Sequence, residues 1–150
     1  MTVVRTLTHE DIRACVELEL ACFAESPWNK TQLTAELARV GAVCLVACHT
    51  NAEVDHEAIG LALGWAITDE AELTRVAVCP QHRRKGVSKQ LLNDLCRRVA
   101  ASGAKRIFLE VREDNVAAIA LYEQMSWKIV GRRKGYYKDG VDALAMERRL

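Results

Sequence analysis

The sequence has almost no net charge and no long apolar run. Lys and Arg number 21 and Asp and Glu number 20 among 150 residues, which leaves a net charge of +1. This balance is not typical of a protein that coats nucleic acid, and no apolar run approaches the roughly 20 residues of a membrane-spanning helix. The first residues, MTVVRTLTHED, also lack the basic-then-apolar pattern of a signal peptide. We therefore expect a cytoplasmic protein with no direct nucleic-acid or membrane partner.

Paired cysteine motifs are absent as well. The six cysteines lie within or beside apolar segments, and none forms a Cys-x-x-Cys pair: Cys15, Cys22, Cys44, Cys48, Cys79 and Cys96. A zinc site needs closer clustering, usually with histidines nearby. We expect the cysteines to be small, buried and reduced, and we expect no metal site.

The chain also lacks linkers, internal repeats and low-complexity segments. Half of its residues are apolar, so 150 residues suffice for one ordinary core. We expect a single domain over residues 1–150. The segments with strand character are 3–7, 42–48, 58–67, 73–79, 105–111, 127–137 and 141–149. The polar stretch 49–57 is predicted as a hairpin loop, and the Asp-Gly of residues 138–140 predicts the turn of a second hairpin.

Four helices are predicted from capping signals and periodicity. Thr8 with Asp11, and Asn29 with Gln32, have the spacing of capping boxes. The strongest helical pattern follows Gly86, where Val87, Leu91, Leu95 and Val99 recur every four residues and Gly103 ends the run. Another helix covers about 115–125. The order of elements predicts a mixed α/β fold whose sheet has about seven strands, mostly antiparallel.

A basic loop with one glycine stands between an apolar strand and the strongest helix. Its sequence is VAVCPQHRRKGVSKQLL, residues 76–92. Unpaired amides at a helix N-terminus, the helix dipole and a glycine make an anion site that suits a pyrophosphate. The residues expected to form it are Arg84, Lys85, Gly86, Val87, Ser88 and Lys89. The glycine patterns of Walker and Rossmann loops are absent. From these residues alone, a solvated basic turn without a ligand remains open.

At this loop the sequence resembles the GNAT family of N-acetyltransferases. The family pattern Arg/Gln-x-x-Gly-x-Gly/Ala corresponds here to Arg83-x-x-Gly86-x-Ser88, with serine in place of the usual glycine or alanine. The resemblance implies that the loop binds the pyrophosphate of acetyl-coenzyme A and that two central strands splay apart. It also implies that the backbone of Val76, Ala77 and Val78 pairs with the pantetheine arm, with the Val76 amide as a donor to the oxyanion.

A second block, LEVREDNVAAIALYEQMSW, resembles the RimI-type members of that family. SPWN and the RR and YY of GRRKGYY support this resemblance. It implies direct acetyl transfer from acetyl-coenzyme A to the N-terminal alanine of a small-subunit ribosomal protein, with Glu110 as general base, Tyr122 as general acid and Asn115 touching the cosubstrate. Departures from the usual pattern are Ser126-Trp127, Gly135 and Arg75, the last at a position that is often Asn.

The chemistry explains these residue types, although each residue has a simpler structural explanation. An α-ammonium must lose a proton before it attacks a thioester, and the departing thiolate must gain one. Glu110 is predicted on the wetter face of its strand, where pairing with Arg112 is the alternative. Tyr122 falls on an apolar helix face, where it can be a core aromatic. Asn115 suits a helix cap, which still leaves hydrogen-bonding capacity for a ligand.

The substrate side of the site is predicted less directly. RimI-type targets begin with a small residue followed by basic ones, which calls for an acidic groove with aromatic walls. The acidic candidates are Asp69, Glu70 and Glu72, and the aromatic candidates are Trp28, Tyr136 and Tyr137. One alternative is an enzyme of the same fold that acetylates lysine side chains or a small amine. Another is a non-catalytic module that binds nucleic acid or nucleotides through the basic loop. We expect a monomer or weak dimer.

Overall fold

A seven-stranded sheet runs through the molecule in the order β1-β2-β3-β4-β5-β7-β6. The computed structural model describes residues 1–51 and 54–150. The strands are β1 (Thr2–Thr6), β2 (Ala42–Asn51), β3 (Val54–Ile67), β4 (Glu70–Val78), β5 (Arg106–Arg112), β6 (Lys128–Arg133) and β7 (Ala143–Arg149). The α-helices are α1 (Ile12–Cys22), α2 (Lys30–Ala38), α3 (Val87–Ala101) and α4 (Val116–Gln124), and two short 3-10 helices are η1 (His9–Asp11) and η2 (Pro80–His82). The described residues thus confirm the predicted order of strands and helices.

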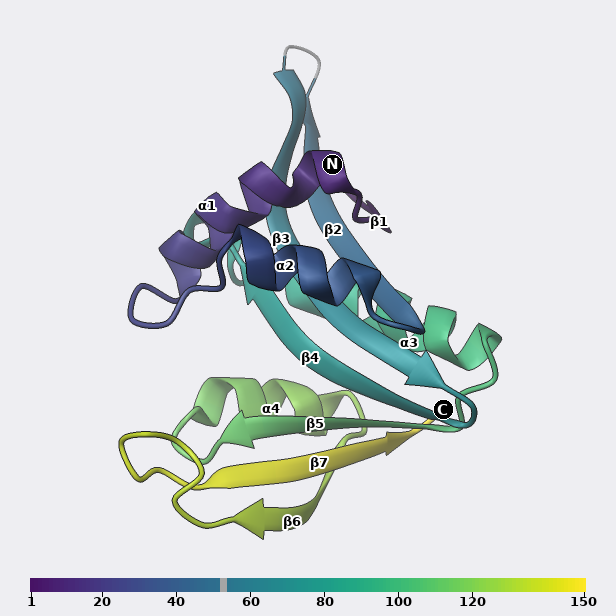
Figure 1. The fold of residues 1–150 in the computed structure, drawn as a ribbon, viewed down its shortest axis with the longest axis vertical. Helices are drawn as coiled ribbons and strands as arrows, with labels where there is room; N and C mark the ends of the chain where they lie inside the picture. Colours follow the sequence, from purple (N-terminus) through teal and green to yellow (C-terminus); the bar gives the residue numbers. More distant parts are fainter. Residues whose placement is uncertain (52–53) are drawn as a thin grey trace.

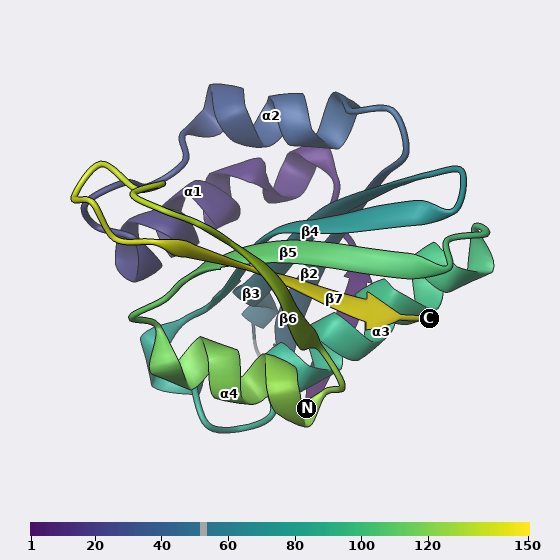
Figure 2. The ribbon, with the colours of Figure 1, turned by 90° about the horizontal axis from the view of Figure 1, so that it is seen from below.

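Helices cover both faces of the sheet (Figure 2), with α1 and α2 on one face and α3 and α4 on the other. Each helix pair closes a separate apolar core. The core under α1 and α2 includes Cys15, Leu18, Leu33, Val46 and Leu61. The core under α3 and α4 includes Leu91, Leu95, Ile107, Tyr122 and Met146.

The local signals in the sequence act as predicted. Val87, Leu91, Leu95 and Val99 are at most 3% exposed, so α3 buries one continuous apolar stripe against the sheet, at about 1.5–3 kcal/mol for each buried side chain. Both capping boxes are present. The Asn29 carboxamide accepts a hydrogen bond from the Gln32 amide at 2.9 Å, and the Gln32 side chain accepts one from the Asn29 amide.

Both hairpins are present, but their strands end at other residues than the sequence predicted. β2 continues to Asn51 and β3 begins at Val54, so most of the predicted loop 49–57 is strand and only 52–53 lies outside the described residues. In the second hairpin the strands are shorter than predicted. β6 ends at Arg133, and the predicted turn lies at the tip of a longer loop, where the Gly140 amide donates to the Tyr137 carbonyl at 2.9 Å.

A β-bulge in β4 separates the two halves of the sheet. Opposite β3, the pairing shifts from Leu63–Arg75 to Gly64–Leu73, which leaves Thr74 without a partner residue. A bulge bends a strand and increases its twist. The parallel pairing of β4 with β5 covers only residues 70–72 and 106–108 and stops just before this bulge. Beyond it, β4 and β5 diverge, as Figure 1 shows, which confirms the predicted splay.

Candidate active site

The splay leaves two strand edges inside the molecule without a partner. The Cys79 amide donates to Ile59 of β3 at 2.7 Å. Because peptide groups alternate in direction along a strand, those of Val76 and Val78 point away from β3, toward the gap. The Val78 carbonyl accepts hydrogen bonds from Cys22 Sγ at 3.3 Å and Arg83 Nε at 3.1 Å. The Val76 peptide group faces the gap where β5 has already left.

The predicted anion site lies at the α3 end of this gap. Gly86 is the N-cap of α3, with a φ of 79° in the left-handed region, and as a glycine it has no side chain to cap the helix. Arg84 also has a positive φ, 61°, so the loop turns twice within three residues. In the first hydrogen bond of the helix, the Gln90 amide donates to the Gly86 carbonyl. The amides of residues 87–89 have no partner within the helix, and Ser88 does not act as a cap.

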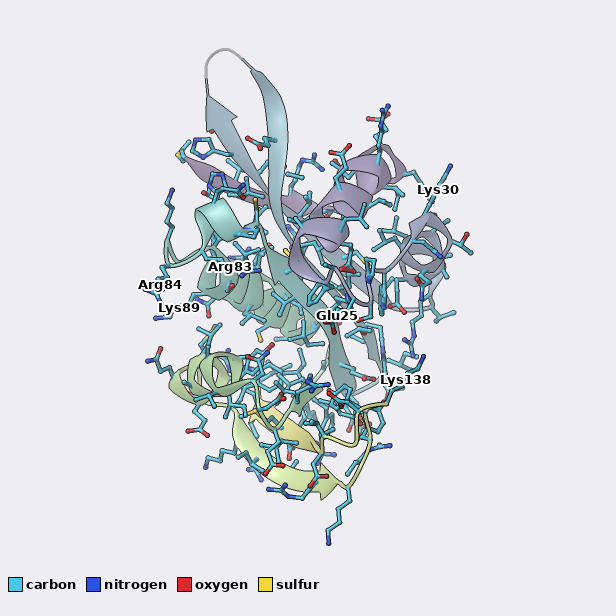
Figure 3. All side chains as sticks on the ribbon, turned by 90° about the vertical axis from the view of Figure 1, so that its left-hand side faces the viewer. Glu25, Lys30, Arg83, Arg84, Lys89 and Lys138 are labelled. Atoms are coloured by element: carbon cyan, nitrogen blue, oxygen red, sulfur yellow. The ribbon has the colours of Figure 1, made fainter. Side chains whose placement is uncertain are left out.

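Three cations surround these amides. Arg84, Lys85 and Lys89 are exposed, and no ion pair joins them to a carboxylate among the side chains that the structure describes, those of residues 1–50 and 57–150. Figure 3 shows Arg84 and Lys89 close together at one edge of the molecule, away from Lys138. Arg83 differs, since its guanidinium hydrogen-bonds the Val78 carbonyl and braces the loop against β4. Amides without a helical partner and exposed cations are the groups that a polyanion site requires.

Glu110 lies on the opposite face of the sheet from α3. Ile107, Leu109 and Val111 are buried in the α3 core, so Phe108 and Glu110 point to the α1 side, as the alternation predicted. There Glu110 lines a pocket of about 320 Å³. The other residues of its lining are Trp65, Glu70, Ala71, Glu72, Phe108, Leu109, Arg133 and Ala145.

The ion-pair partner of Glu110 is not the one that the sequence suggested. Arg133 Nε lies 3.0 Å from Glu110 Oε1. Arg112, the alternative partner from the sequence, instead binds Asp114 and Asp139. The Arg133 side chain is 63% exposed, and exposed pairs of this kind contribute about 0–1 kcal/mol. An incoming ammonium group can therefore compete with Arg133 for the Glu110 carboxylate.

Glu72 is a second carboxylate of the same pocket. Burial raises its pKa, the Arg39 guanidinium opposes that rise, and the Glu110 and Glu36 carboxylates add to it. Glu70 also lines the pocket but pairs with Arg106 at 3.2 Å. Asp69, the remaining acidic candidate, is not part of the lining. Among the described residues, Glu72 is therefore the carboxylate of this lining without an ion-pair partner, while Glu70 and Glu110 each pair with an arginine.

Tyr122 occupies the other face of the sheet, on α4. It is 6% exposed, and it shares an apolar core with Val78 at the end of β4 and Val87 at the start of α3. Its ring packs at 5.8 Å against Trp127, one of the departures from the usual family pattern. Burial raises the pKa of Tyr122 to about 12, which keeps its hydroxyl protonated at neutral pH. Asn115 caps α4 through its Oδ1, which accepts from the Ala118 amide at 3.2 Å.

The predicted aromatic walls stand on two loops at the open end of the gap. Tyr136 and Tyr137 pack edge to face at 5.1 Å in the β6–β7 loop. Tyr137 is within electrostatic reach of Glu110, because its pKa is raised first by burial and then by the Glu110 charge. Trp28 stands in the α1–α2 loop, where its ring covers the guanidinium of Arg75 at 4.7 Å.

The described part of the chain has neither a metal cluster nor a membrane-length helix. Within 1–51 and 54–150, no three His, Cys, Asp or Glu side chains gather as they would around a metal ion. No helix there combines the length and apolarity needed to cross a membrane.

Comparisons with known proteins agree on one family. The model of the acetyltransferase (GNAT) family matches residues 12–127. The chain is 33% identical to N-alpha-acetyltransferase RimI of Mycobacterium tuberculosis, over 97% of this chain and 90% of that protein. The crystal structure of the ribosomal-protein-S18-alanine N-acetyltransferase from Escherichia coli superposes with a TM-score of 0.87 at 28% identity, covering 99% of this chain and 94% of that one.

One further relative is much longer than this chain. An uncharacterized protein of Mycobacterium leprae is 37% identical over 97% of this chain, which spans only 40% of that protein.

Proposed function

The chain belongs to the GNAT family of acetyltransferases, and from this premise we propose that it transfers acetyl from acetyl-coenzyme A to the α-amino group of a protein N-terminus. The proposed acceptor is the N-terminal alanine of a small-subunit ribosomal protein, the substrate named for the Escherichia coli relative. The observation that carries the proposal is the splay of β4 from β5 beyond residues 72 and 108, because it opens the sheet between the face of α3, with its basic loop, and the face with the pocket that Glu110 lines.

The chain's own groups suit coenzyme A. The amides of residues 87–89, with Arg84, Lys85 and Lys89 around them, provide donors and positive charge for a pyrophosphate. The Val76 peptide group is available to an extended amide-containing arm, as in strand addition. Buried Val87 fixes the start of α3 beneath the loop. Asn115 Oδ1 is used by its cap, so its side-chain NH₂ remains for a ligand.

The two catalytic candidates, Glu110 and Tyr122, lie on opposite faces of the sheet. Bound acetyl-coenzyme A supplies a thioester, whose carbonyl carbon bonds to the amine nitrogen while its bond to sulfur breaks. Glu110, on the α1 face, accepts the proton that the α-ammonium must lose, directly or through water. Tyr122, on the α4 face, gives its phenolic proton to the departing sulfur. The Val76 amide donates to the acetyl oxygen as negative charge develops there.

The acidic pocket suits a basic residue behind the acceptor alanine. Glu72 is half buried and has no ion-pair partner among the residues that the structure describes. A carboxylate in such surroundings interacts more strongly with a cation than an exposed one does, because water screens it less. With Tyr136 and Tyr137 across the gap, the pocket favours a polypeptide over a small amine.

A peptide panel tests this proposal. Peptides beginning with Ala, Ser or Met, an acetyl-blocked peptide and peptides with internal lysines are incubated with acetyl-coenzyme A, and the products are located by mass spectrometry. We expect acetylation of the free N-terminus, fastest for Ala followed by a basic residue, and none of the blocked peptide. Acetylation confined to lysine side chains or to small amines would replace the proposal by its alternative.

Loss of the Tyr122 hydroxyl should impair turnover without affecting the fold. Tyr122→Phe keeps the buried ring and its packing on Trp127, so the melting temperature should change little. We expect kcat to fall by about 100-fold, because a positioned general acid is lost. The pH–rate profile of the wild type should show no decrease from deprotonation of this tyrosine at ordinary pH, because its pKa of about 12 keeps it protonated. Tyr137→Phe is the control; a rate loss there, with Tyr122→Phe unaffected, would move the acid to Tyr137.

Glu72 should control selectivity for the second residue of the acceptor. Glu72→Gln removes a charge but keeps the shape, so we expect KM to rise about five-fold for an Ala-Arg peptide and to stay constant for an Ala-Ala peptide. The steady-state constants of both peptides are measured. Glu70→Gln is the matched control, because Glu70 lines the same pocket but is already paired with Arg106. Equal effects on the two peptides would contradict a role in selectivity.

A further inference from the structure

Arg75 makes a buried ion pair that ties β4 to α1. Its Nε lies 2.6 Å from Oε1 of Glu19, and its terminal nitrogen Nη2 donates to Oε2 of Glu19 at 3.0 Å. Glu19 is fully buried and the Arg75 side chain is 17% exposed. A carboxylate that is completely removed from water needs a well-aligned partner, so Arg75 is held in one orientation.

The same guanidinium reaches the loop between α1 and α2, residues 23–29. Nη2 of Arg75 donates a hydrogen bond to the Ser26 carbonyl at 3.2 Å. Its carbon Cζ lies 3.9 Å from the centre of the Phe23 ring and 4.7 Å from the centre of the Trp28 ring. One side chain thus contacts the beginning, middle and end of this loop, through stacking and a hydrogen bond.

The place of Arg75 on β4 connects this loop to the acidic pocket. Arg75 directly follows the bulge at Thr74, and its contact with Glu19 of α1 puts it on the sheet face that carries Glu72. Figures 1 and 2 show the α1–α2 loop and the β6–β7 loop at the same end of the molecule, above and below the opening between β4 and β5. The β6–β7 loop carries Tyr137, which senses the Glu110 charge. In Figure 1 the α1–α2 loop lies on the other side of that opening.

Only an arginine can make this set of contacts. Its planar guanidinium binds a carboxylate through two nitrogens while two aromatic rings stack against it. A lysine ammonium is instead a single point of charge on a flexible stem. Replacement by lysine therefore keeps the charge opposite Glu19 but loses the two stacked rings and the link to Ser26.

We propose that Arg75 is a positioning residue that fixes the α1–α2 loop as one wall of the entrance for the acceptor polypeptide. This inference rests on the proposed function, because it assigns the wall to the acceptor side of that site. Arg75 touches no reacting atom and acts through Phe23, Ser26 and Trp28. Its loss therefore weakens binding of the acceptor, while acetyl-coenzyme A, bound from the α3 side, is unaffected.

The test compares Arg75→Lys with Arg5→Lys in the full chain. Two nitrogens of Arg5 also donate to one carboxylate, that of Asp11, at 2.8 Å each, but Arg5 lies on β1, at the far edge of the sheet. For Arg75→Lys we expect KM for the acceptor peptide to rise about ten-fold, with kcat and the calorimetric Kd for acetyl-coenzyme A within two-fold of wild type. Amide exchange in residues 23–29 should accelerate. Arg5→Lys should leave all four quantities unchanged.

Glu19→Gln is the second variant if Arg75→Lys does not fold, because it keeps the packing and only loosens the hold on Arg75. An unchanged acceptor KM, or a loss of acetyl-coenzyme A affinity equal to the loss of acceptor affinity, would overturn the inference. Failure of the proposed function looks different. Wild type would then acetylate lysines or small amines instead of N-termini, and the same comparison, made with that acceptor, would decide the role of Arg75.

Discussion

Replacing Glu110 by glutamine should lower kcat at pH 7 by about 100-fold or more while leaving the affinity for acetyl-coenzyme A nearly intact. Glutamine keeps the size of the side chain but cannot accept the proton of the α-ammonium. Because an α-amino group has a pKa of about 7.7–8.0, the deficit should shrink as the pH rises and the amine loses its proton unaided. Steady-state rates from pH 6.5 to 9.5 and calorimetry with the cosubstrate measure the two effects.

Glu147→Gln is the matched control for this experiment. Glu147 lies on the neighbouring strand β7, is 21% exposed against 28% for Glu110, and also pairs with an arginine, Arg106 at 3.5 Å. It does not line the pocket. We expect wild-type kinetics from Glu147→Gln. Wild-type turnover in Glu110→Gln would remove Glu110 as the general base.

Replacing Gly86 by valine should reduce the affinity for acetyl-coenzyme A by about 100-fold. A β-branched residue at a φ of 79° is strained by about 1–3 kcal/mol, and relief of that strain moves the amides of residues 87–89. An added Cβ would meet no atom within 4 Å beyond its chain neighbours, so the effect would come from the loop backbone and not from a clash with a packed side chain. Calorimetric titration with coenzyme A measures the loss.

Gly140→Val separates the local effect from backbone strain. Gly140 has a φ of 86°, and an added Cβ there also meets nothing within 4 Å, but it lies at the tip of the β6–β7 loop. We expect a similar decrease in melting temperature for the two variants and normal coenzyme A binding only for Gly140→Val. Unchanged affinity in Gly86→Val would refute the assignment of the loop to the pyrophosphate.

Local features of the site could be predicted because nearby residues determine them. The stripe from Val87 to Val99 depends on the 3.6-residue period of one helix, and the outward direction of Glu110 depends on the two-residue period of one strand. The Asn29–Gln32 capping box depends on a spacing of three residues. The left-handed glycine of the loop is equally local. These features account for the correct order of strands and helices and for the left-handed turn before α3.

Contacts between distant segments could not be predicted. Arg133 reaches Glu110 because β7, although last in sequence, lies between β5 and β6. The sequence placed Arg112 there instead, since it shares a face of β5 with Glu110. Arg75 and Glu19 are 56 residues apart, and no periodicity links them. A bulge of one residue also leaves no signal in the sequence, although β4 and β5 stop pairing next to it.

The bulge at Thr74 has a consequence for solubility. By ending the pairing of β4 with β5, it leaves two strand edges in the middle of the sheet, in addition to the outer edges of β1 and β6. Exposed edges are templates for aggregation through strand pairing with other chains. These inner edges diverge and have helices on both faces (Figures 1 and 2), so a second β-sheet cannot approach them. The divergence proposed to accommodate an extended arm thus also protects the molecule from its own unpaired edges.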